Sequence, residues 1–428
     1  MKNVAYILVE VFQFLNKRRY AVLRNYDSLP HASGRDIDII IERRDFFIIR
    51  KSLAGLFFHN GFYLIQYYEG SEMHSMVFAS SQLGKTDIIS FDFLFSIYVR
   101  NLVLFEAKDL LETRIFNGEI FHVRKDWEFL AKYTYNTILK EDYPLKYEAV
   151  KAEALNLYPL EIGKALKSIG INDCTSGVRA ASVSQKLWVL HFVRTSYSTL
   201  RYCVATISNL FYPKGISVGF TGPDGSGKTT VIDQIRKRLQ AVYPSILLLH
   251  HRPALMGNLG EVAHFAGIKK GVDRQFDKPH RGKKRGKLSS ILRLAYYSTD
   301  YVCGYFIKVH PFLFKRSIII FDRYYTDIIC DSRRSSIYLS HKFLYWFGLL
   351  FIPQLRHNIL LTADSQTILE RKQELDKEGI DAINHKIDYL VTKKGYYKVM
   401  NEGTPQEAVE KILQIIFEEQ HKMNIKRL

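Results

Sequence analysis

The sequence predicts an α/β protein: a C-terminal parallel sheet flanked by helices, an N-terminal α+β domain, and a helical connector. Three observations predict this fold class. A glycine-rich stretch, residues 222–230, follows an apolar run at 216–220 and precedes an amphipathic one. Later apolar runs end in polar residues, as strands of a parallel sheet do. Near the N-terminus, Asp36 and Asp38 flank one apolar residue at the start of an apolar run.

The composition is that of a folded protein with several domains. The 428 residues are 47% apolar and 14% aromatic, which allows two or three packed domains and excludes global disorder. The four cysteines are far apart and form no Cys-x-x-Cys pair, which argues against a zinc site or a disulfide framework and for a reducing compartment. Glu10 interrupts the first apolar run, and no small-residue cleavage site follows, so we expect a helix rather than a signal peptide. The expected location is cytoplasmic.

The net charge of +18 indicates acidic partners, such as nucleotides, nucleic acid, anionic glycans or a membrane surface. No motif indicates nucleic acid in particular. Much of the charge lies in residues 268–288, where nine Lys or Arg accompany two Asp. A solvated loop is the preferred interpretation of this segment, and a dedicated binding patch is the alternative.

The N-terminal part, residues 1–125, is expected to form its own domain. Helical periodicity covers residues 4–17, and strand patterns follow at 20–23, 36–42 and 88–93. Side chains separated by one residue project from the same face of a strand. Asp36 and Asp38 therefore form a pair that could hold Mg²⁺ beside a triphosphate. Asp92 is preferred to Asp87 as the third carboxylate because it lies within its apolar run.

This pattern resembles the nucleotidyltransferase fold over residues 18–125. The sequence departs from that family where Leu23-Arg24-Asn25 stands in place of its Gly-Ser turn. Three interpretations of this domain are open: active nucleotidyl transfer, an inherited fold without activity, and an acidic strand edge balanced by Arg24 or Arg35.

Residues 126–213 are expected to form a helical connector. Helical patterns cover residues 127–132, 147–157, 159–169 and 184–212. The last of these is strongly apolar, but Lys186, Arg194 and Arg201 lie inside it, and charges at the centre of a membrane span are costly. We expect a helix that packs between two domains, and an interfacial membrane helix is the alternative.

The C-terminal domain, residues 214–428, begins with a phosphate-binding pattern of Gly, four residues, and Gly-Lys-Thr. Its glycines let backbone N–H groups surround a polyphosphate at a helix N-terminus. Lys228 can reach the β- and γ-phosphates, and the Thr229 hydroxyl can bind Mg²⁺. ATP and Mg²⁺ are therefore the expected cofactors. The expected nucleotide-binding residues are Gly222, Asp224, Gly225, Ser226, Gly227, Lys228, Thr229 and Thr230.

Three more strands are predicted in this domain, at residues 245–253, 317–322 and 357–361. Arg252 ends the first of them, where it could hold an anion of the acceptor. Asp322 ends the second, where it could bind the Mg²⁺ shell. A helix after Ser365 carries Arg371 and could act as a lid. The last helix is expected from Pro405 to about residue 419, capped by Thr404, with a frayed tail at 421–428.

Together these motifs resemble the thymidylate kinase family over residues 216 to about 420. The phosphate loop has Asp224 at that family's acidic position, and Asp322-Arg323-Tyr324 matches its Asp-Arg-Tyr motif. Arg371 corresponds to the family's lid arginine, and Arg252-Pro253 to a shortened Arg-Glu-Pro-Gly segment. The resemblance implies that Asp224 contacts the substrate sugar, and that Arg252 and Arg323, with Tyr324 beside them, hold the acceptor.

These features predict Mg²⁺-dependent transfer of the ATP γ-phosphoryl group to a phosphorylated acceptor, either a dTMP-like nucleoside monophosphate or a related sugar phosphate. The expected catalytic residues are Lys228, Asp322, Arg323 and Arg371. Two other functions are open: a regulatory or scaffold protein with a nucleotide switch, and a nucleotidyltransferase acting through the N-terminal aspartates. A homodimer and a peripheral membrane contact are also open.

Overall fold

The computed structural model describes residues 4–32, 36–82, 84–171, 180–256, 286–372 and 375–428. The chain divides into two compact units. The first contains residues 1–80, 87–212 and 417–428, and the second contains residues 81–86 and 213–416. Most of the basic segment at 268–288 lies outside the described residues.

The elements up to residue 212 include strands, helices and one short 3₁₀ helix. They are α1 (Val4–Leu15), β1 (Tyr20–Val22), β2 (Asp36–Ile41), α2 (Arg43–His59), β3 (Tyr63–Glu69), β4 (Met73–Gln82), β5 (Lys85–Leu94), β6 (Ser96–Val99), β7 (Leu102–Glu106), α3 (Ala107–Glu112), β8 (Ile115–Phe116), β9 (Phe121–His122), α4 (Lys125–Leu139), η1 (Leu145–Tyr147), α5 (Glu148–Leu157), α6 (Pro159–Ser168), α7 (Ala180–Leu190) and α8 (Phe192–Phe211).

The later elements alternate strands with helices, as expected of a parallel α/β sheet. They are β10 (Ile216–Thr221), α9 (Lys228–Leu239), β11 (Ile246–His250), α11 (Lys287–Gly304), the π-helix η3 (Tyr305–Val309), α12 (His310–Phe314), β12 (Ile318–Asp322), α13 (Tyr325–Cys330), α14 (Ser332–Ser335), α15 (His341–Phe351), β13 (His357–Thr362), α16 (Ser365–Arg371), α17 (Lys377–Val391), β14 (Tyr396–Met400) and α18 (Pro405–Ile425).

The first unit contains a mixed seven-stranded sheet in the order β3-β4-β5-β2-β1-β9-β8. Its strand β2 pairs antiparallel with β1 and parallel with β5. Ile37, Ile39 and Ile41 of β2 pack in one core with α1 and α2, whereas Ile40 belongs to the core that contains α4. Since side chains alternate along a strand, Asp38 lies on the same side of the sheet as Ile40.

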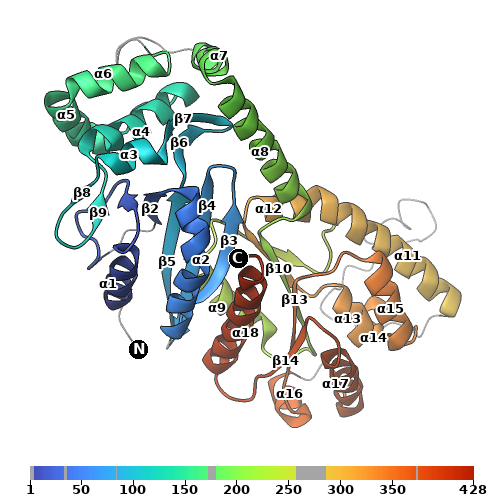
Figure 1. The fold of residues 1–428 in the computed structure, drawn as a ribbon. Helices are drawn as coiled ribbons and strands as arrows, with labels where there is room; N and C mark the ends of the chain where they lie inside the picture. The colour runs from blue at the N-terminus through green and yellow to red at the C-terminus, as the bar shows by residue number, and fades with distance from the viewer. Residues whose placement is uncertain (1–3, 33–35, 83, 172–179, 257–285, 373–374) are drawn as a thin grey trace. The chain divides into compact units, whose positions relative to one another are not determined.

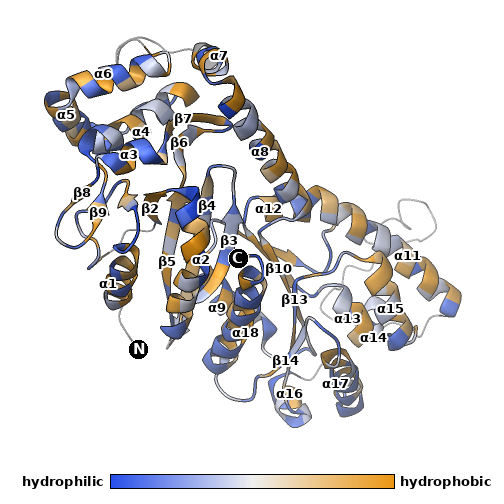
Figure 2. Ribbon diagram, viewed as in Figure 1, coloured by the Kyte–Doolittle hydropathy of each residue, from blue (hydrophilic) through white to orange (hydrophobic). Residues whose placement is uncertain are grey.

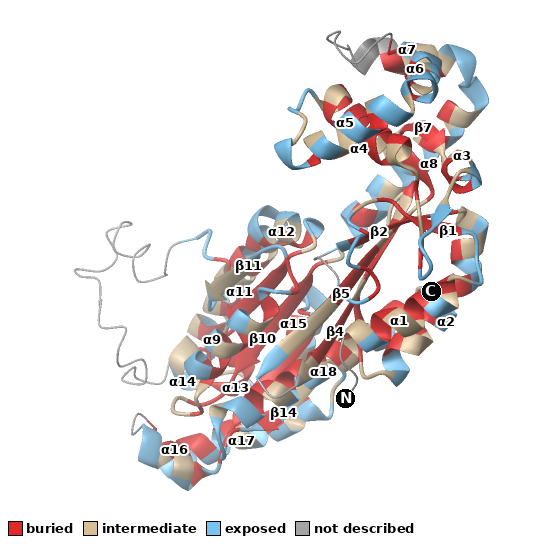
Figure 3. Ribbon diagram, turned by 90° about the vertical axis from the view of Figure 1, so that its left-hand side faces the viewer, coloured by how far each residue is buried: buried red, intermediate tan, exposed pale blue. Residues whose placement is uncertain are grey.

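The second unit contains a parallel five-stranded sheet in the order β11-β12-β10-β13-β14. Helix α9 lies on one side of this sheet, and α13 and α15 lie on the other (Figure 1). The central strands are apolar and buried, because helices cover both faces (Figures 2 and 3). This is the expected parallel sheet flanked by helices.

The strands expected at 216–220, 245–253, 317–322 and 357–361 are confirmed as β10, β11, β12 and β13. The edge strand β14 was not predicted. Its burial is only partial, and the run Tyr396–Met400 contains Lys398, so its apolar signal is weak.

The stretch at 184–212 is not one helix. Helix α7 ends at Leu190, and α8 begins at Phe192, because His191 has the non-helical dihedrals φ −134° and ψ 45°. Arg194 and Arg201, the charges within α8, form ion pairs with Glu106 and Glu72 at 3.1 and 3.4 Å. Among the described residues, no helix is long and apolar enough to cross a membrane.

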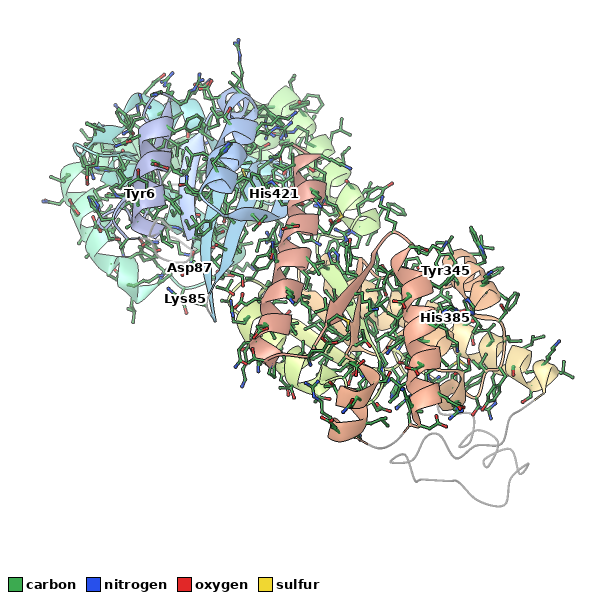
Figure 4. All side chains as sticks on the ribbon, turned by 90° about the horizontal axis from the view of Figure 1, so that it is seen from below. Tyr6, Lys85, Asp87, Tyr345, His385 and His421 are labelled. Atoms are coloured by element: carbon green, nitrogen blue, oxygen red, sulfur yellow. The ribbon has the colours of Figure 1, made fainter. Side chains whose placement is uncertain are left out.

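The expectation that the tail at 421–428 is frayed is also wrong. Helix α18 continues to Ile425, and the last residues belong to the first unit. His421, labelled in Figure 4, stacks on Phe58 and accepts a hydrogen bond from the Leu64 N–H at 3.0 Å. Asn424 donates to the Leu64 carbonyl at 3.0 Å, and Leu428 is only 6% exposed. These contacts order the tail although its sequence is basic.

Candidate active site

Polar residues follow the strands of the parallel sheet at its carboxyl edge. The loop after β10 leads into α9, and His250 and Asp322 end the neighbouring strands β11 and β12. Asn401 follows β14 at the same edge. Ligands of open parallel sheets bind outside the carboxyl ends of the strands, so this edge is the candidate site of the second unit.

The glycines of the loop at 222–227 stand at positions where a side chain would clash with neighbouring atoms. A Cβ on Gly222 would clash with the Leu361 carbonyl oxygen of β13. Gly227 has φ +84°, a left-handed conformation, and a Cβ there would clash with the Asn401 side-chain amide. The glycines therefore allow the loop to lie close against the sheet before α9 begins at Lys228.

Lys228 is buried beneath this loop. Its ammonium group donates to the carbonyls of Gly222 and Pro223 at 2.8 and 2.7 Å, and Ser226 Oγ lies 3.4 Å away. Burial, and then the nearby positive charge of Arg323, lower the pKa of Lys228 to about 7, although Asp224 opposes the shift. At neutral pH, Lys228 is therefore near the point at which its ammonium group loses a proton.

Arg323 links the loop to the end of β12. Its guanidinium donates to Asp327 Oδ1 at 2.7 Å and to Asp224. Arg334 donates to the other oxygen of Asp224. Burial alone would lower the pKa of Arg323, but Asp327 and then Asp224 outweigh it and raise the pKa. Arg323 also has φ +71°, and such strain is retained where surrounding contacts fix the backbone.

Asp322 and Thr229 fit the requirements of a Mg²⁺ site beside a phosphate. Asp322 Oδ2 lies 3.2 Å from His250 Nδ1. Its other oxygen, Oδ1, is buried and has no hydrogen-bond partner among the described residues, which is costly unless a ligand or water satisfies it. Thr229 is exposed in the first turn of α9. A carboxylate and a hydroxyl are both oxygen ligands of the kind Mg²⁺ prefers.

A pocket of about 430 Å³ lies beside Arg252. Arg252 donates to the buried Asp300 at 3.1 Å, and its guanidinium lies 4.5 Å from the ring centre of Tyr297. Tyr324 also lines the pocket, but its hydroxyl donates to the Pro353 carbonyl. The other lining residues are His250, His251, Ala254, Tyr301, Asp327, Ile328, Arg334 and Ser335.

Arg371 lies at the end of α16, on the exposed side of the loop. Its guanidinium donates to the Asn401 carbonyl at 2.8 Å, and the Asn401 side chain donates to the Ser226 carbonyl at 2.8 Å. Asn401 therefore joins Arg371 to the loop. Sequence reasoning missed Asn401 as a site residue; the available signal was a polar residue directly after the weak strand at 396–400.

Arg334 is a second site residue that was not among those expected from the sequence. Its partner Asp224 lies 110 positions away, so no local pattern could show the contact. Thr230, by contrast, lies exposed in α9, and the structure gives it no further role.

In the first unit, the structure brings Asp38 and Asp92 together but not a three-carboxylate site. The register of the parallel strands β2 and β5 places Asp38 opposite Asp92, and Asp36 opposite Ser90. Asp36 is exposed at the start of β2. Arg24 donates to Asp38 Oδ2 at 2.5 Å. Within the described parts of the chain, no group of three His, Cys, Asp or Glu is placed to hold a metal ion.

Asp87 lies near the start of β5 (Figure 4). Asp92 lies five positions further along the strand, and because this offset is odd the two side chains leave the strand on opposite faces. Asp92 is the acidic residue of β5 that lines the same pocket as Asp38.

No protein-family model matches the sequence, and no curated protein matches it. Among solved structures, the chain is similar to a thymidylate kinase from Ehrlichia chaffeensis. The two share 14% sequence identity with a TM-score of 0.33, over 47% of this chain and 98% of that one.

Proposed function

We propose that the second unit, residues 213–416 with 81–86, forms a phosphotransferase that moves the γ-phosphoryl group of ATP to a phosphorylated acceptor. The observation that carries this proposal is that two candidate anion-binding sites lie next to each other at the carboxyl edge of the parallel sheet. The phosphate loop and Lys228 lie at the carboxyl end of β10, and the pocket beside Arg252 lies at the ends of β11 and β12. Arg323 stands between them, bonded to Asp224 of the loop and to Asp327 of the pocket.

Each residue has a role that follows from its position. Lys228 leaves the loop carbonyls to meet the β- and γ-phosphates, where its positive charge is stabilised. Asp322 and Thr229 hold Mg²⁺, which neutralises charge on the phosphate oxygens when bound. Arg323 stabilises charge on the migrating group, and Arg371 adds a cation from the α16 side. Catalysis consists of positioning and charge stabilisation, since phosphoryl transfer needs little covalent help from the protein.

The acceptor is proposed to be a nucleoside monophosphate or a sugar phosphate. Arg252 and Arg334 supply positive charge to its phosphate, and the tyrosines of the pocket supply flat apolar walls. Burial raises the pKa of Tyr324, so its hydroxyl stays protonated. Asp224 is engaged by Arg323 and Arg334, and it would meet a sugar hydroxyl through the oxygen lone pairs that remain.

An acceptor screen tests this proposal against a nucleotide switch. The protein is incubated with γ-labelled ATP, Mg²⁺ and one candidate at a time from nucleoside monophosphates, sugar phosphates and phospholipid headgroups. We expect labelled product with an acceptor that carries a phosphate, because the pocket is cationic. Slow hydrolysis without a labelled acceptor across the whole panel would favour the switch.

The lowered pKa of Lys228 predicts that nucleotide affinity falls as pH rises. In the free protein Lys228 loses its proton above about pH 7, whereas a bound polyphosphate needs the ammonium form. Binding therefore takes up a proton above that pH, and the affinity should fall by about tenfold per pH unit. Calorimetry of a non-hydrolysable ATP analogue in buffers of different ionisation enthalpy measures this uptake.

Lys228→Arg is the matched control, because a guanidinium keeps its charge over this range. The uptake attributed to the lysine should vanish in that variant. An unchanged pH dependence would assign the effect to the nucleotide phosphates or to another group.

A further inference from the structure

A pocket of about 550 Å³ opens beside Asp38 and Asp92 in the first unit. Strands β2 and β5 supply its acidic floor, since the two aspartates stand opposite each other in the parallel register. Helix α4 and the hairpin of β6 and β7 supply its walls, and Tyr147 closes one side. Pockets of this size hold small-molecule ligands in proteins.

A guanidinium lies where a divalent cation would be expected. The Leu23 N–H donates to the Asp38 carbonyl at 2.8 Å, which fixes the chain after β1 against β2. Arg24 follows directly, and its Nε donates to Asp38 Oδ2 at 2.5 Å. This contact supplies the balancing charge and takes one of the carboxylate oxygens that a metal ion would need. The residues present therefore do not fit a Mg²⁺ site.

The walls are aromatic and apolar, and the rim is cationic. Tyr98, Tyr135 and Tyr147 line the pocket together with aliphatic side chains. The Tyr135 ring is 42% exposed, and Lys132 Nζ lies 5.6 Å from its centre. Arg100 is exposed at the turn between β6 and β7 with φ +55°. This left-handed conformation is unusual for an arginine and is retained by surrounding contacts at functional positions more often than elsewhere.

We propose that this pocket binds a nucleoside monophosphate, a ligand with a planar ring and a phosphate group, without a divalent cation. The ring stacks on the exposed face of Tyr135, since every base offers a π-face to a tyrosine. Arg100 and Lys132 pair with the phosphate at the rim. Asp92 accepts a hydrogen bond from a ribose hydroxyl at the floor. Arg24 pairs with Asp38, and Lys125 pairs at 3.2 Å with Glu128, the third carboxylate of the lining, so two of the three carboxylates already have a cationic partner.

Equilibrium binding tests the ligand class in the double variant Lys228→Ala with Arg252→Met, which weakens both the phosphate loop and the proposed acceptor pocket of the second unit. Calorimetry is run with AMP, GMP, CMP, UMP and dTMP, each alone and in excess EDTA. We expect at least one to bind, and Arg100→Glu and Tyr135→Ala each to weaken it by about tenfold or more. Arg333→Met, at an exposed arginine of the second unit, is the control and should leave this binding unchanged.

Two results would overturn the ligand assignment: no binding by any of the five, or binding insensitive to both first-unit variants. Circular dichroism shows whether each variant is folded. Because Tyr135 and Arg100 come from different elements, the loss of fold in one variant leaves the other to decide.

Manganese binding tests the absence of a metal. Electron paramagnetic resonance counts bound Mn²⁺ in the Lys228→Ala protein and in the same protein with Arg24→Ala. We expect Arg24→Ala to gain a site, since it uncovers Asp38 beside Asp92. A Mn²⁺ site already present with Arg24 in place and removed by Asp92→Asn would contradict the proposal. Both experiments are independent of phosphotransfer, so either unit can fail its test without deciding the other.

Discussion

Lys228→Ala is expected to lower the rate of phosphoryl transfer by about a thousandfold or more while the fold remains. The ammonium of Lys228 is a buried cation held by the phosphate loop. Arg323 cannot replace it, because Asp224 and Asp327 fix its guanidinium. Steady-state transfer of labelled phosphate to the best acceptor of the screen measures the loss.

The fold should tolerate this change because two effects oppose each other. Removal of Lys228 leaves the carbonyls of Gly222 and Pro223 without that donor, which costs about 1–3 kcal/mol. It also removes a cation from a buried position, which is favourable. Lys237→Ala is the matched control, since Lys237 is exposed on the same helix, α9. Unchanged ATP consumption in Lys228→Ala would refute the phosphotransferase.

The parallel sheet could be predicted because its strands carry local signals. Buried strands of this kind are continuous apolar runs, and those before Gly222 and Asp322 end in polar residues at the site edge. The loop also has a fixed pattern, in which Gly222 is required by the close approach of β13 and Gly227 by that of Asn401. For the strands and the loop, the residues that determine the local structure therefore lie within a short stretch of sequence.

The partners of the site residues could not be predicted, because they depend on tertiary contacts. Asp224 meets Arg334 over 110 positions, and Asn401 meets Ser226 over 175. The metal hypothesis for Asp36 and Asp38 had the same weakness. The spacing of the two aspartates shows that they share a face. Arg24 and Arg35 were both open as their basic partners; the tertiary contact selects Arg24 for Asp38, and Arg35 lies outside the described residues.

The end of the chain shows a tertiary effect that overrides composition. Residues 421–428 are basic, which suggested fraying, yet Arg427 pairs with Glu69 at 2.9 Å and Leu428 is buried. The partners come from β3 and the core of the first unit. Local sequence could not show that those partners were present.

Arg323→Met is expected to destabilise the second unit by about 3–5 kcal/mol and to abolish transfer. Arg323 is 6% exposed and Asp327 is 6% exposed, so the variant leaves a buried carboxylate without the guanidinium that now bonds it at 2.7 Å. Asp224 keeps Arg334 and is affected less. Unfolding in guanidinium chloride, followed in the isolated variants, measures the loss of stability.

Two further variants separate the buried charge from the general loss of an arginine. Arg333→Met removes a 51% exposed arginine whose partner Asp376 is also exposed, at 3.6 Å, so solvent screens that pair and the change should be within about 0.5 kcal/mol. Arg323→Met with Asp327→Asn removes the uncompensated charge, and it should recover stability but not transfer.

Recovery of stability without activity would show that Arg323 has two functions: it neutralises the buried carboxylate in the resting protein, and it supplies positive charge to the migrating phosphoryl group. If Arg323→Met is as stable as Arg333→Met, the buried network does not hold the site together, and the proposed arrangement of Asp224, Arg323 and Asp327 is wrong.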